Sequence, residues 1–423
     1  MALHPKKMDL SLGRLERLLN QMDNPERRLP PVIHVAGTNG KGSTIAFMRS
    51  ILEAAGKKVH VYTSPHLSRF NERFRLAGKL VTDERLSETL ERIEKLNDGQ
   101  PITFFELTTA AAFDLFTQVE ADYVLLETGL GGRMDSTNVI PAPLGCVITP
   151  ISIDHVQFLG NTIELIAFEK AGIMKPGTKA VFSRQKHAAM DVLEKRAAQL
   201  GITPFVGGQD FDGYPERDRF TYHDLNGLED LSAPGLKGIH QFENATTAIA
   251  ALKHFGVELT TDAISKGVAG TQWPARMMPL PGLLQNSLAP HSDLWLDGGH
   301  NVAGAQVLAQ GLGDLNQRQS RPLTLILGML ANKDVEGYLR CFQGLAKNII
   351  AIPVPADDMT TNAGSSPETL SEIAANQGFA STYASDVKSA LQLVRRDAPQ
   401  RVVICGSLYL AGDILLENKT PPQ

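Results

Sequence analysis

The 423-residue sequence has few cysteines, no long run of one charge and no long apolar run. Its three cysteines, Cys146, Cys341 and Cys405, are far apart, so their spacing predicts no disulfide framework or metal site and favours a reducing compartment. The formal net charge of −5 is spread along the chain, without the basic patch of a nucleic-acid binder. No run is long enough for a membrane span, and the first ten residues lack the apolar core of a signal peptide. We therefore expect a cytoplasmic protein without nucleic-acid or membrane partners.

What the chain does contain is an alternation of apolar runs and helical periodicity. Hydrophobic residues make up 43% and charged residues 21%, which is typical of a globular protein, and the length favours two domains. Strand-like runs occur at 31–36, 58–64, 122–128, 145–151 and 179–183. Strands that alternate with helices predict a mostly parallel sheet covered on both faces.

A proline-rich stretch at 273–293 interrupts this alternation, and we interpret it as a linker. The alternation then restarts with the runs DLWLDGG, LTLILGML, NIIAIPV and QRVVICGS. We therefore expect an α/β protein with two domains. Residues 1–280 would form a domain with a mostly parallel sheet, and residues 281–423 a smaller Rossmann-like α/β domain.

The stretch HVAGTNGKGST at 34–44 lies between a strand-like run and a helical one. It departs from the usual phosphate-binding loop, because only two residues separate Gly37 from Gly40 and Gly42 follows Lys41 directly. Glycines let backbone N–H groups approach phosphate oxygens, the following helix offers its positive N-terminus, and Lys41 adds a charge. The alternative is a glycine-rich turn that happens to contain a lysine. Because strand, Gly-Lys and helix stand in the required order, we predict a nucleotide site.

This loop resembles that of the Mur-ligase superfamily and, with its glycine after the lysine, more closely that of the folylpolyglutamate synthase/dihydrofolate synthase family. Nine further stretches are similar to motifs of this family and follow the family order: TSPHLSRFNERF (63–74), TFFELTTAAAF (103–113), LETGLGGRMDSTN (126–138), SIDHVQFLGNT (152–162), EKAGIMKPG (169–177), HQFENATTA (240–248), LDGGHN (296–301), GMLANKD (328–334) and CGSLYLAG (405–412). Since the motifs run from near the start almost to the end, the sequence is identified as a member of this family.

The resemblance implies an ATP-dependent amide ligase that adds L-glutamate to dihydropteroate and to the γ-carboxylate of reduced folates through an acyl phosphate. Residues 1–280 would then be a Mur-ligase-type ATP-binding domain with a pterin site, and residues 281–423 a glutamate-ligase domain. We expect a monomer with Mg²⁺, ATP as co-substrate and small-molecule partners only. The alternatives are a folylpolyglutamate synthase alone or a muramoyl-type peptide ligase. A nucleotide-hydrolysing switch and a non-catalytic nucleotide-binding module are less compatible with the motifs.

The resemblance also implies nucleotide contacts from the loop and from three later residues. They are Thr38, Asn39, Gly40, Lys41, Gly42, Ser43, Asn244, Arg276 and Asp297. On their own, the three later residues are equally interpreted as a helix N-cap, a linker charge and a strand-end carboxylate. The family commonly has glycine where this chain has Ala275, which leaves the local backbone geometry open.

Ser64 and Glu127 follow or end strand-like runs, and ligands of open α/β sheets gather at the carboxyl ends of strands. Magnesium prefers oxygen ligands, so chemistry alone favours Glu127 as a ligand and favours a capping or core role for His155. The resemblance implies that Ser64, Glu127 and His155 ligate magnesium, and that Lys170 is carbamylated to N6-carboxylysine and supplies anionic oxygens. The alternatives are a solvated charge for Glu127 and an exposed helix lysine for Lys170. Lys41, Lys170 and His155 are the predicted catalytic residues.

The stretch TFFE places two aromatic rings beside a carboxylate, which suits a flat heterocycle with ring N–H groups, although such phenylalanines are more often core residues. By resemblance, a pterin site is lined by Thr103, Phe104, Phe105, Glu106, Met134, Asp135 and Ser136, and dihydropteroate is contacted by Lys7, Met8, Asp9 and Leu10. His300 is expected to position the incoming amino acid.

Overall fold

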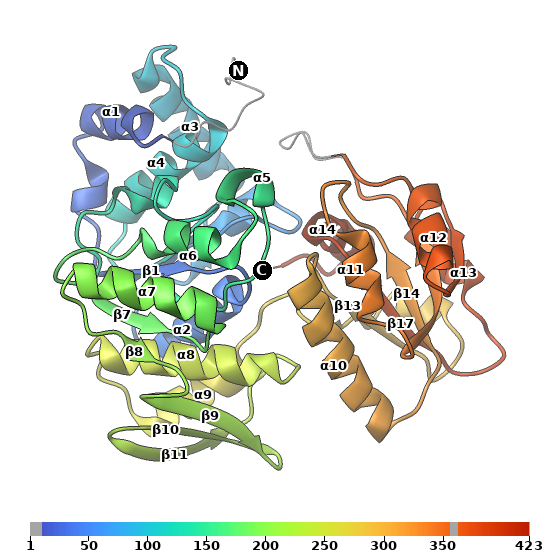
Figure 1. Ribbon diagram of the computed structural model, residues 1–423. Coiled ribbons are helices and arrows are strands. Elements are labelled where there is room, and N and C mark those ends of the chain that lie inside the picture. Colours follow the sequence, from blue (N-terminus) through green and yellow to red (C-terminus); the bar gives the residue numbers. More distant parts are fainter. Residues whose placement is uncertain (1–10, 356–362, 423) are drawn as a thin grey trace. The chain divides into compact units, whose positions relative to one another are not determined.

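The computed structural model describes residues 11–355 and 363–422, so Lys7, Met8, Asp9 and Leu10 lie outside the described residues. The chain divides into two compact units (Figure 1). The first comprises Met1–His66, Phe70–Gly235 and Gln241–Gln272, and the second Leu67–Arg69, Leu236–His240 and Trp273–Gln423. Among the described residues, no helix is long and apolar enough to cross a membrane.

The first unit is built on an eight-stranded sheet with the order β4-β3-β2-β5-β1-β6-β7-β8. The strands are β1 (Val32–Ala36), β2 (Val59–Tyr62), β3 (Phe74–Leu76), β4 (Lys79–Leu80), β5 (Tyr123–Glu127), β6 (Gly145–Ile148), β7 (Lys179–Phe182) and β8 (Phe205–Val206). All neighbours pair in parallel except at the β2–β3 and β3–β4 edge. The mostly parallel sheet predicted from the apolar runs is therefore confirmed.

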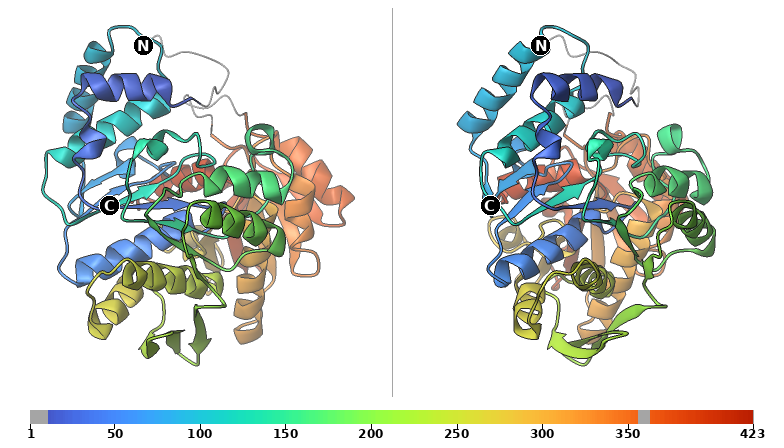
Figure 2. Two further views of the ribbon diagram at one scale, coloured as in Figure 1. Left: turned by 60° about the vertical axis from the view of Figure 1, so that its left-hand side comes forward. Right: turned by 90° about the vertical axis from the view of Figure 1, so that its left-hand side faces the viewer.

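Helices cover both faces of this sheet (Figures 1 and 2). They are α1 (Gly13–Gln21), α2 (Lys41–Ala54), α3 (Asp83–Asn97), α4 (Phe104–Thr117), α5 (Val156–Leu159), α6 (Ile163–Ala171), α7 (His187–Gln199), α8 (His240–His254) and α9 (Thr261–Gly270). One hydrophobic cluster joins α1 and α4 to β5, and another joins α6 and α7 to β6 and β7. The opposite face carries α2, which packs on α9. Since both faces are covered, every residue of β1 is buried.

A small antiparallel sheet of β9 (Phe211–Glu216), β10 (Arg219–Asp224) and β11 (Gly227–Ser232) also belongs to the first unit. Its strands are rich in charged residues and contain no apolar run, so no pattern in the sequence predicted this sheet. It is held by a few buried side chains, of which Phe220 packs edge-on against Phe242 of α8 at 5.5 Å.

The second unit contains a six-stranded sheet with the order β12-β13-β17-β14-β15-β16, parallel except for β12. Its strands are β12 (Met278–Pro279), β13 (Asp293–Leu296), β14 (Leu323–Leu327), β15 (Ala346–Ala351), β16 (Ala380–Tyr383) and β17 (Arg401–Cys405). Its helices are α10 (Val302–Arg318), α11 (Val335–Arg340), α12 (Pro367–Asn376), α13 (Val387–Leu393) and α14 (Leu408–Glu417). This is the predicted second α/β fold.

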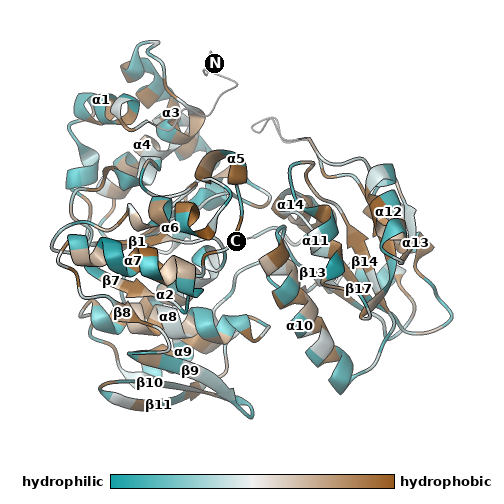
Figure 3. Ribbon diagram, viewed as in Figure 1, coloured by the Kyte–Doolittle hydropathy of each residue, from teal (hydrophilic) through white to brown (hydrophobic). Residues whose placement is uncertain are grey.

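The prediction that 273–293 is a linker was wrong. The longest segment of the second unit begins at Trp273, ahead of the boundary expected at 280, and β12 within this stretch pairs with β13. Proline is tolerated on an edge strand, so its abundance did not exclude packed structure. Figure 3 shows hydrophobic residues on the strands of both units and on α5. In α5, Val156 is 48% exposed.

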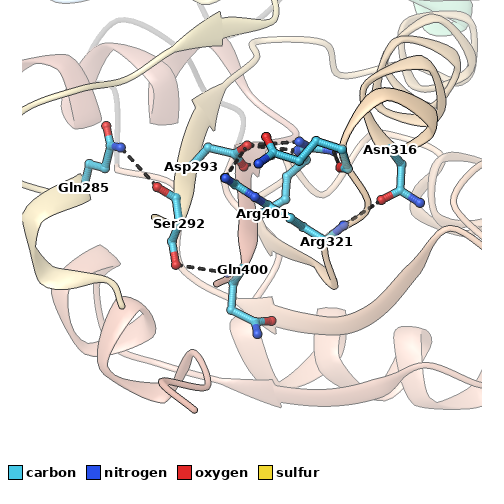
Figure 4. Close-up of polar contacts among 8 residues, drawn as sticks. Gln285, Ser292, Asp293, Asn316, Arg321, Gln400 and Arg401 are labelled. Carbon is cyan, nitrogen blue, oxygen red and sulfur yellow. Dashed lines mark hydrogen bonds and ion pairs between the residues drawn. The ribbon is translucent and has the colours of Figure 1, made fainter. Parts of the chain in front are cut away.

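A polar network ties together the amino ends of β13 and β17 (Figure 4). The carboxylate of Asp293 accepts hydrogen bonds from Arg401 Nη2 at 3.0 Å and from Arg321 Nη1 at 2.9 Å. Asn316 accepts from the backbone of Arg321, and the Ser292 hydroxyl accepts from the backbone of Gln400. Because the Arg401 side chain is only 3% exposed, its charge depends on this carboxylate.

We expect Asp293→Ala to lower the free energy of unfolding of the second unit by about 3 kcal/mol, because a buried guanidinium loses its counter-charge. Thermal and urea unfolding would measure it. Asp397→Ala is the control, since Asp397 pairs with Arg395 at the surface and should leave the midpoint unchanged. Equal midpoints for both variants would contradict a stabilising role for the network.

Candidate active site

The loop after β1 leaves the centre of the sheet at its carboxyl edge, between the ends of β5 and β6. Two of its glycines have positive φ angles, +155° at Gly37 and +85° at Gly40. A Cβ atom on Gly37 would lie 1.8 Å from Thr149 Oγ1, and one on Gly40 would lie 2.5 Å from Asn244 Oδ1. Both positions therefore require glycine, because neighbouring segments approach the loop backbone directly.

The loop is anchored to the segment that follows β6. The backbone N–H groups of Thr38 and Asn39 donate to Pro150 O, and the Thr38 hydroxyl donates to Ser152 O. Asn39 Nδ2 donates to the Ser152 hydroxyl at 3.1 Å. The loop ends where α2 begins at Lys41, and the next two residues, Gly42 and Ser43, are buried in its first turn. A fixed loop that ends on a helix N-terminus is suited to bind phosphate.

Two lysines converge on one carbonyl of this loop. Lys41 Nζ donates to Gly37 O at 3.2 Å and to Thr38 O at 3.4 Å, and Lys170 Nζ from α6 donates to Gly37 O at 2.8 Å. Lys170 is only 4% exposed, which excludes the alternative of an exposed helix lysine. Burial, and then the charge of Lys41, lower the pKa of Lys170 to about 7. A large fraction of this amine is therefore neutral and nucleophilic near neutral pH.

Glu127 at the end of β5 is 5% exposed, which excludes a solvated charge. Its carboxylate lies 3.9 Å from Lys41 Nζ and accepts a hydrogen bond from Ser64 N at 3.3 Å. The Ser64 hydroxyl is buried and has no hydrogen-bond partner among the residues that the structure describes. A buried hydroxyl without a partner is costly unless a ligand completes it, so Ser64 and Glu127 fit the oxygen donor set of a hard divalent cation.

His155, the third predicted metal ligand, is exposed and caps α5 with a φ of +50°. Asp154 accepts a hydrogen bond from its backbone N–H at 2.8 Å. Within the described residues, no group of three or more His, Cys, Asp or Glu side chains could hold a metal ion. A modified Lys170, water and the substrate are possible sources of further oxygen ligands beside Ser64 and Glu127.

The glycine-rich segment after β5 packs directly on α6 and so fixes the position of Lys170. A Cβ atom on Gly132 would lie 2.8 Å from Glu169 O. Arg133 N donates to the same carbonyl at 2.7 Å, and the Arg133 guanidinium pairs with the Glu169 carboxylate at 2.9 Å. The motif LETGLGGR therefore joins Glu127 and Lys170 in one rigid arrangement.

Asp135 belongs to a buried polar chain beneath the loop. Its carboxylate accepts hydrogen bonds from Leu130 N at 2.7 Å and from the Thr137 hydroxyl at 2.5 Å, and burial raises its pKa. The Thr137 hydroxyl lies 2.8 Å from His34 Nε2. Since both Asp135 oxygens bind groups of its own segment, this side chain fixes the glycine-rich loop. A pterin contact through Met134, Asp135 or Ser136 stays a prediction.

The predicted pterin stretch begins α4. Thr103 and Glu106 form a capping box, and the Glu106 carboxylate also pairs with Arg14 at 3.0 Å. Phe104 and Phe105 are half-buried; Phe104 packs against Phe70 with ring centroids 5.2 Å apart. Glu106 thus has a structural role that the sequence analysis missed, while the partly accessible rings leave the stacking role as a prediction.

Asn244 lies inside α8, so its interpretation as an N-cap was wrong. In the second unit, Arg276 and Asp297 lie close together: Asp297 accepts from Met277 N at 2.7 Å, and the charge of Arg276 acts on its pKa. His300 Nδ1 lies 3.2 Å from Gly298 O in the same loop. The structure therefore groups the predicted site residues of the second unit around the end of β13.

Comparison with known families follows this division of the chain. Residues 35–252 match the model of the Mur ligase middle domain, and residues 284–417 match the dihydrofolate synthetase C-terminal domain. The dihydrofolate synthase/folylpolyglutamate synthase of Bacillus subtilis is 32% identical over 95% of this chain and 94% of its own length. The chain belongs to the folylpolyglutamate synthase/dihydrofolate synthase family. The predicted family, fold class and ligase class are thus confirmed: it is an ATP-dependent ligase of the folate family.

Other members of the family differ in the activities they are named for. The folylpolyglutamate synthase of Lacticaseibacillus casei is 33% identical over 95% of this chain and 92% of its own length. A structure of the Escherichia coli enzyme in complex with DHPP and ADP has a TM-score of 0.87 and 29% identity, and covers 98% of this chain and 95% of its own. A bifunctional family member with Mn, AMPPNP and L-glutamate bound has a TM-score of 0.85 and 30% identity, with the same coverage.

The buried imidazole of His34 makes the stability of this folate-family ligase depend on pH. Burial, and then the charge of Lys175, lower its pKa from 6.5 to about 3, so between these values the unfolded chain binds more protons than the folded one. Stability is fully present above pH 6.5 and falls as the pH drops toward 3, by up to about 1.4 kcal/mol per pH unit from this residue. We expect a flatter profile for His34→Gln, measured by urea unfolding between pH 7.5 and 4.

The matched control is His187→Gln, at a side chain that is 90% exposed. It should reproduce the wild-type slope. If the free energy of unfolding of His34→Gln depends on pH as steeply as that of the wild type, His34 is not the source of the acid sensitivity.

Proposed function

We propose that this chain uses ATP and Mg²⁺ to add L-glutamate both to dihydropteroate and to the γ-carboxylate of reduced folates. The observation that carries the proposal is a cluster of charged residues at the phosphate loop: Lys41 and Lys170 both donate to the Gly37 carbonyl, and Glu127 lies 3.9 Å from Lys41. This charge arrangement supports phosphoryl transfer more directly than simple nucleotide storage. The names of the relatives support the two acceptors and the amino acid.

In the first step, an oxygen of the acceptor carboxylate attacks the γ-phosphorus of ATP, and the bond from that phosphorus to the bridging oxygen of ADP breaks. The resulting acyl phosphate is attacked by the α-amine of L-glutamate; phosphate leaves and the amine loses a proton. The protein contributes orientation and charge neutralisation and no covalent nucleophile. Lys41 is the residue that would meet the transferring phosphoryl group, with the loop residues Thr38–Ser43 and Asn244 as further nucleotide contacts.

Ser64 and Glu127, together with His155, are the proposed residues for magnesium, which would neutralise phosphate charge when bound. The unpartnered Ser64 hydroxyl beside the Glu127 carboxylate supports this assignment.

We further propose that Lys170 is carbamylated. Its neutral amine would attack carbon dioxide, form an N–C bond and lose one proton. The product carries anionic oxygens that suit a hard cation. The buried position and the pKa of about 7 support this reaction, because only an uncharged amine is nucleophilic.

In the predicted pterin site, the half-buried rings of Phe104 and Phe105 would stack on the pterin. Met134, Asp135 and Ser136 would line the same site. Arg276 and Asp297 stay predicted nucleotide contacts of the second unit, and His300 stays the predicted neighbour of the amino acid. A monomeric state and a cytoplasmic location also stay predictions. The three free thiols agree with a reducing compartment.

We expect turnover of ATP with L-glutamate and either dihydropteroate or tetrahydrofolate, and none with a muramoyl peptide. Because one site would serve both acceptors, each should inhibit the other competitively. Phosphate release and mass analysis of the products would measure this. Absent turnover of dihydropteroate would reduce the protein to a folylpolyglutamate synthase, and turnover of the muramoyl peptide alone would refute the proposal.

Lys41→Ala and Lys170→Ala should each lower turnover by about 10²–10³-fold, because each removes a group at the transferring phosphate. Only Lys170→Ala should regain activity with an added short carboxylate, which replaces the carbamate oxygens. Lys41→Ala thus serves as its control, and Lys266→Ala, at a side chain that is 70% exposed, should match the wild type. Equal responses of both lysine variants to the carboxylate, or a plain Lys170 amine in active enzyme by intact mass, would refute the carbamate.

A further inference from the structure

The turn that carries Arg276 has an unusual backbone. The residues on either side, Ala275 and Met277, have φ angles of +55° and +42°, a region that favours glycine. Both are buried, at 0% and 3% exposure. Two such residues in three positions are costly and persist only where surrounding contacts hold them.

The contacts that hold this turn come from the loop after β13. Gly298 N donates to Ala275 O at 2.9 Å, and Met277 N donates to Asp297 Oδ2 at 2.7 Å. The other oxygen of Asp297 accepts from Gly299 N at 2.7 Å. One buried carboxylate therefore clamps the strained turn to its own loop.

The Met277 side chain provides a second attachment. Its Sδ atom lies 2.5 Å from the place that a Cβ atom on Gly311 would occupy. Gly311 lies within α10, so the missing Cβ leaves room for Met277 to pack on the helix. Two residues further, Gly313 has open space where its Cβ would be.

Between these two attachments, the Arg276 side chain is directed by the turn itself. Its Nη1 donates to Ala275 O at 2.8 Å and lies 3.1 Å from the place of a Cβ atom on Gly298. A change in the backbone at Ala275 or Met277 would therefore move the guanidinium.

We propose that Asp297 is a positioning residue that acts through Arg276: with Met277 and Gly311 it holds the left-handed turn in which Arg276 can meet the nucleotide. This inference rests on the proposed function, in which Arg276 contacts ATP. This role is additional to the nucleotide contact predicted for Asp297, because both oxygens of this carboxylate accept backbone N–H groups of the turn and of its own loop.

The first test is rescue by a second substitution. Asp297→Asn should raise the Kd for ADP and the KM for ATP by about tenfold or more, since a buried N–H loses its charged acceptor, with a smaller change in kcat. Adding Ala275→Gly should recover at least about threefold, because glycine adopts the turn without strain. The control is Ala77→Gly, whose φ of +45° lies in a turn of the first unit and which should recover nothing. If the double variant Asp297→Asn, Ala275→Gly binds ADP no more tightly than Asp297→Asn alone, the proposal is overturned.

A second variant leaves both charged residues in place. Gly311→Ala inserts a methyl group against Met277 Sδ and should raise the KM for ATP several-fold, whereas Gly313→Ala in the same helix should not. Equal KM values for these two variants would also overturn the proposal.

A failure of the proposed function can be distinguished from a failure of the positioning role. If the wild type binds no ADP, the proposed function fails, while amide hydrogen exchange at Met277 without nucleotide still tests the clamp. Asp297→Asn should accelerate this exchange, and Ala275→Gly should partly slow it again. Exchange that is unaffected by Asp297→Asn would overturn the positioning role.

Discussion

The close approach of other segments to the backbone at Gly37 is the constraint on which the site of the first unit depends. Only a residue without a side chain fits there, because Thr149 Oγ1 occupies the place of its Cβ atom. The strand that leads to it, β1, lies between β5 and β6. Glu127 ends β5 and Ser152 follows β6. Because both strands are neighbours of β1, these two residues contact the same loop.

The same closeness creates an electrostatic problem that the chain resolves only in part. Lys41 and Lys170 both donate to the Gly37 carbonyl, so two like charges meet in a place where one of them is buried. The nearby carboxylate, Glu127, lies 3.9 Å from Lys41. The repulsion and the burial together lower the pKa of Lys170, and the neutral amine relieves both costs. A carbamate would go further, because it replaces the repulsion from Lys41 by an attraction.

Sequence alone predicted those parts of the molecule that leave a local signal. The buried strands β1 and β5 appear as continuous apolar runs, and the glycine-lysine loop stands between a strand and a helix. The hydrogen bond between His34 and Thr137 leaves no such signal, because its partners are 103 positions apart. The position of Asn244 was misjudged because a residue near the start of a helical pattern looks like a cap, whereas α8 already begins at His240.

Ala275 shows how a left-handed backbone is accommodated without glycine. This chain places a methyl group on such a backbone in the core of the second unit. Burial of the methyl group offsets part of the strain of the left-handed backbone. It would stabilise any other backbone conformation that buries Ala275 by the same amount. The left-handed conformation itself is stabilised by hydrogen bonds that form only in this turn. In them, Gly298 N donates to Ala275 O, and Met277 N donates to the Asp297 carboxylate. With alanine at this position, the turn relies more on the carboxylate of Asp297 than it would with glycine, so the effect of changing Asp297 depends on the residue at position 275.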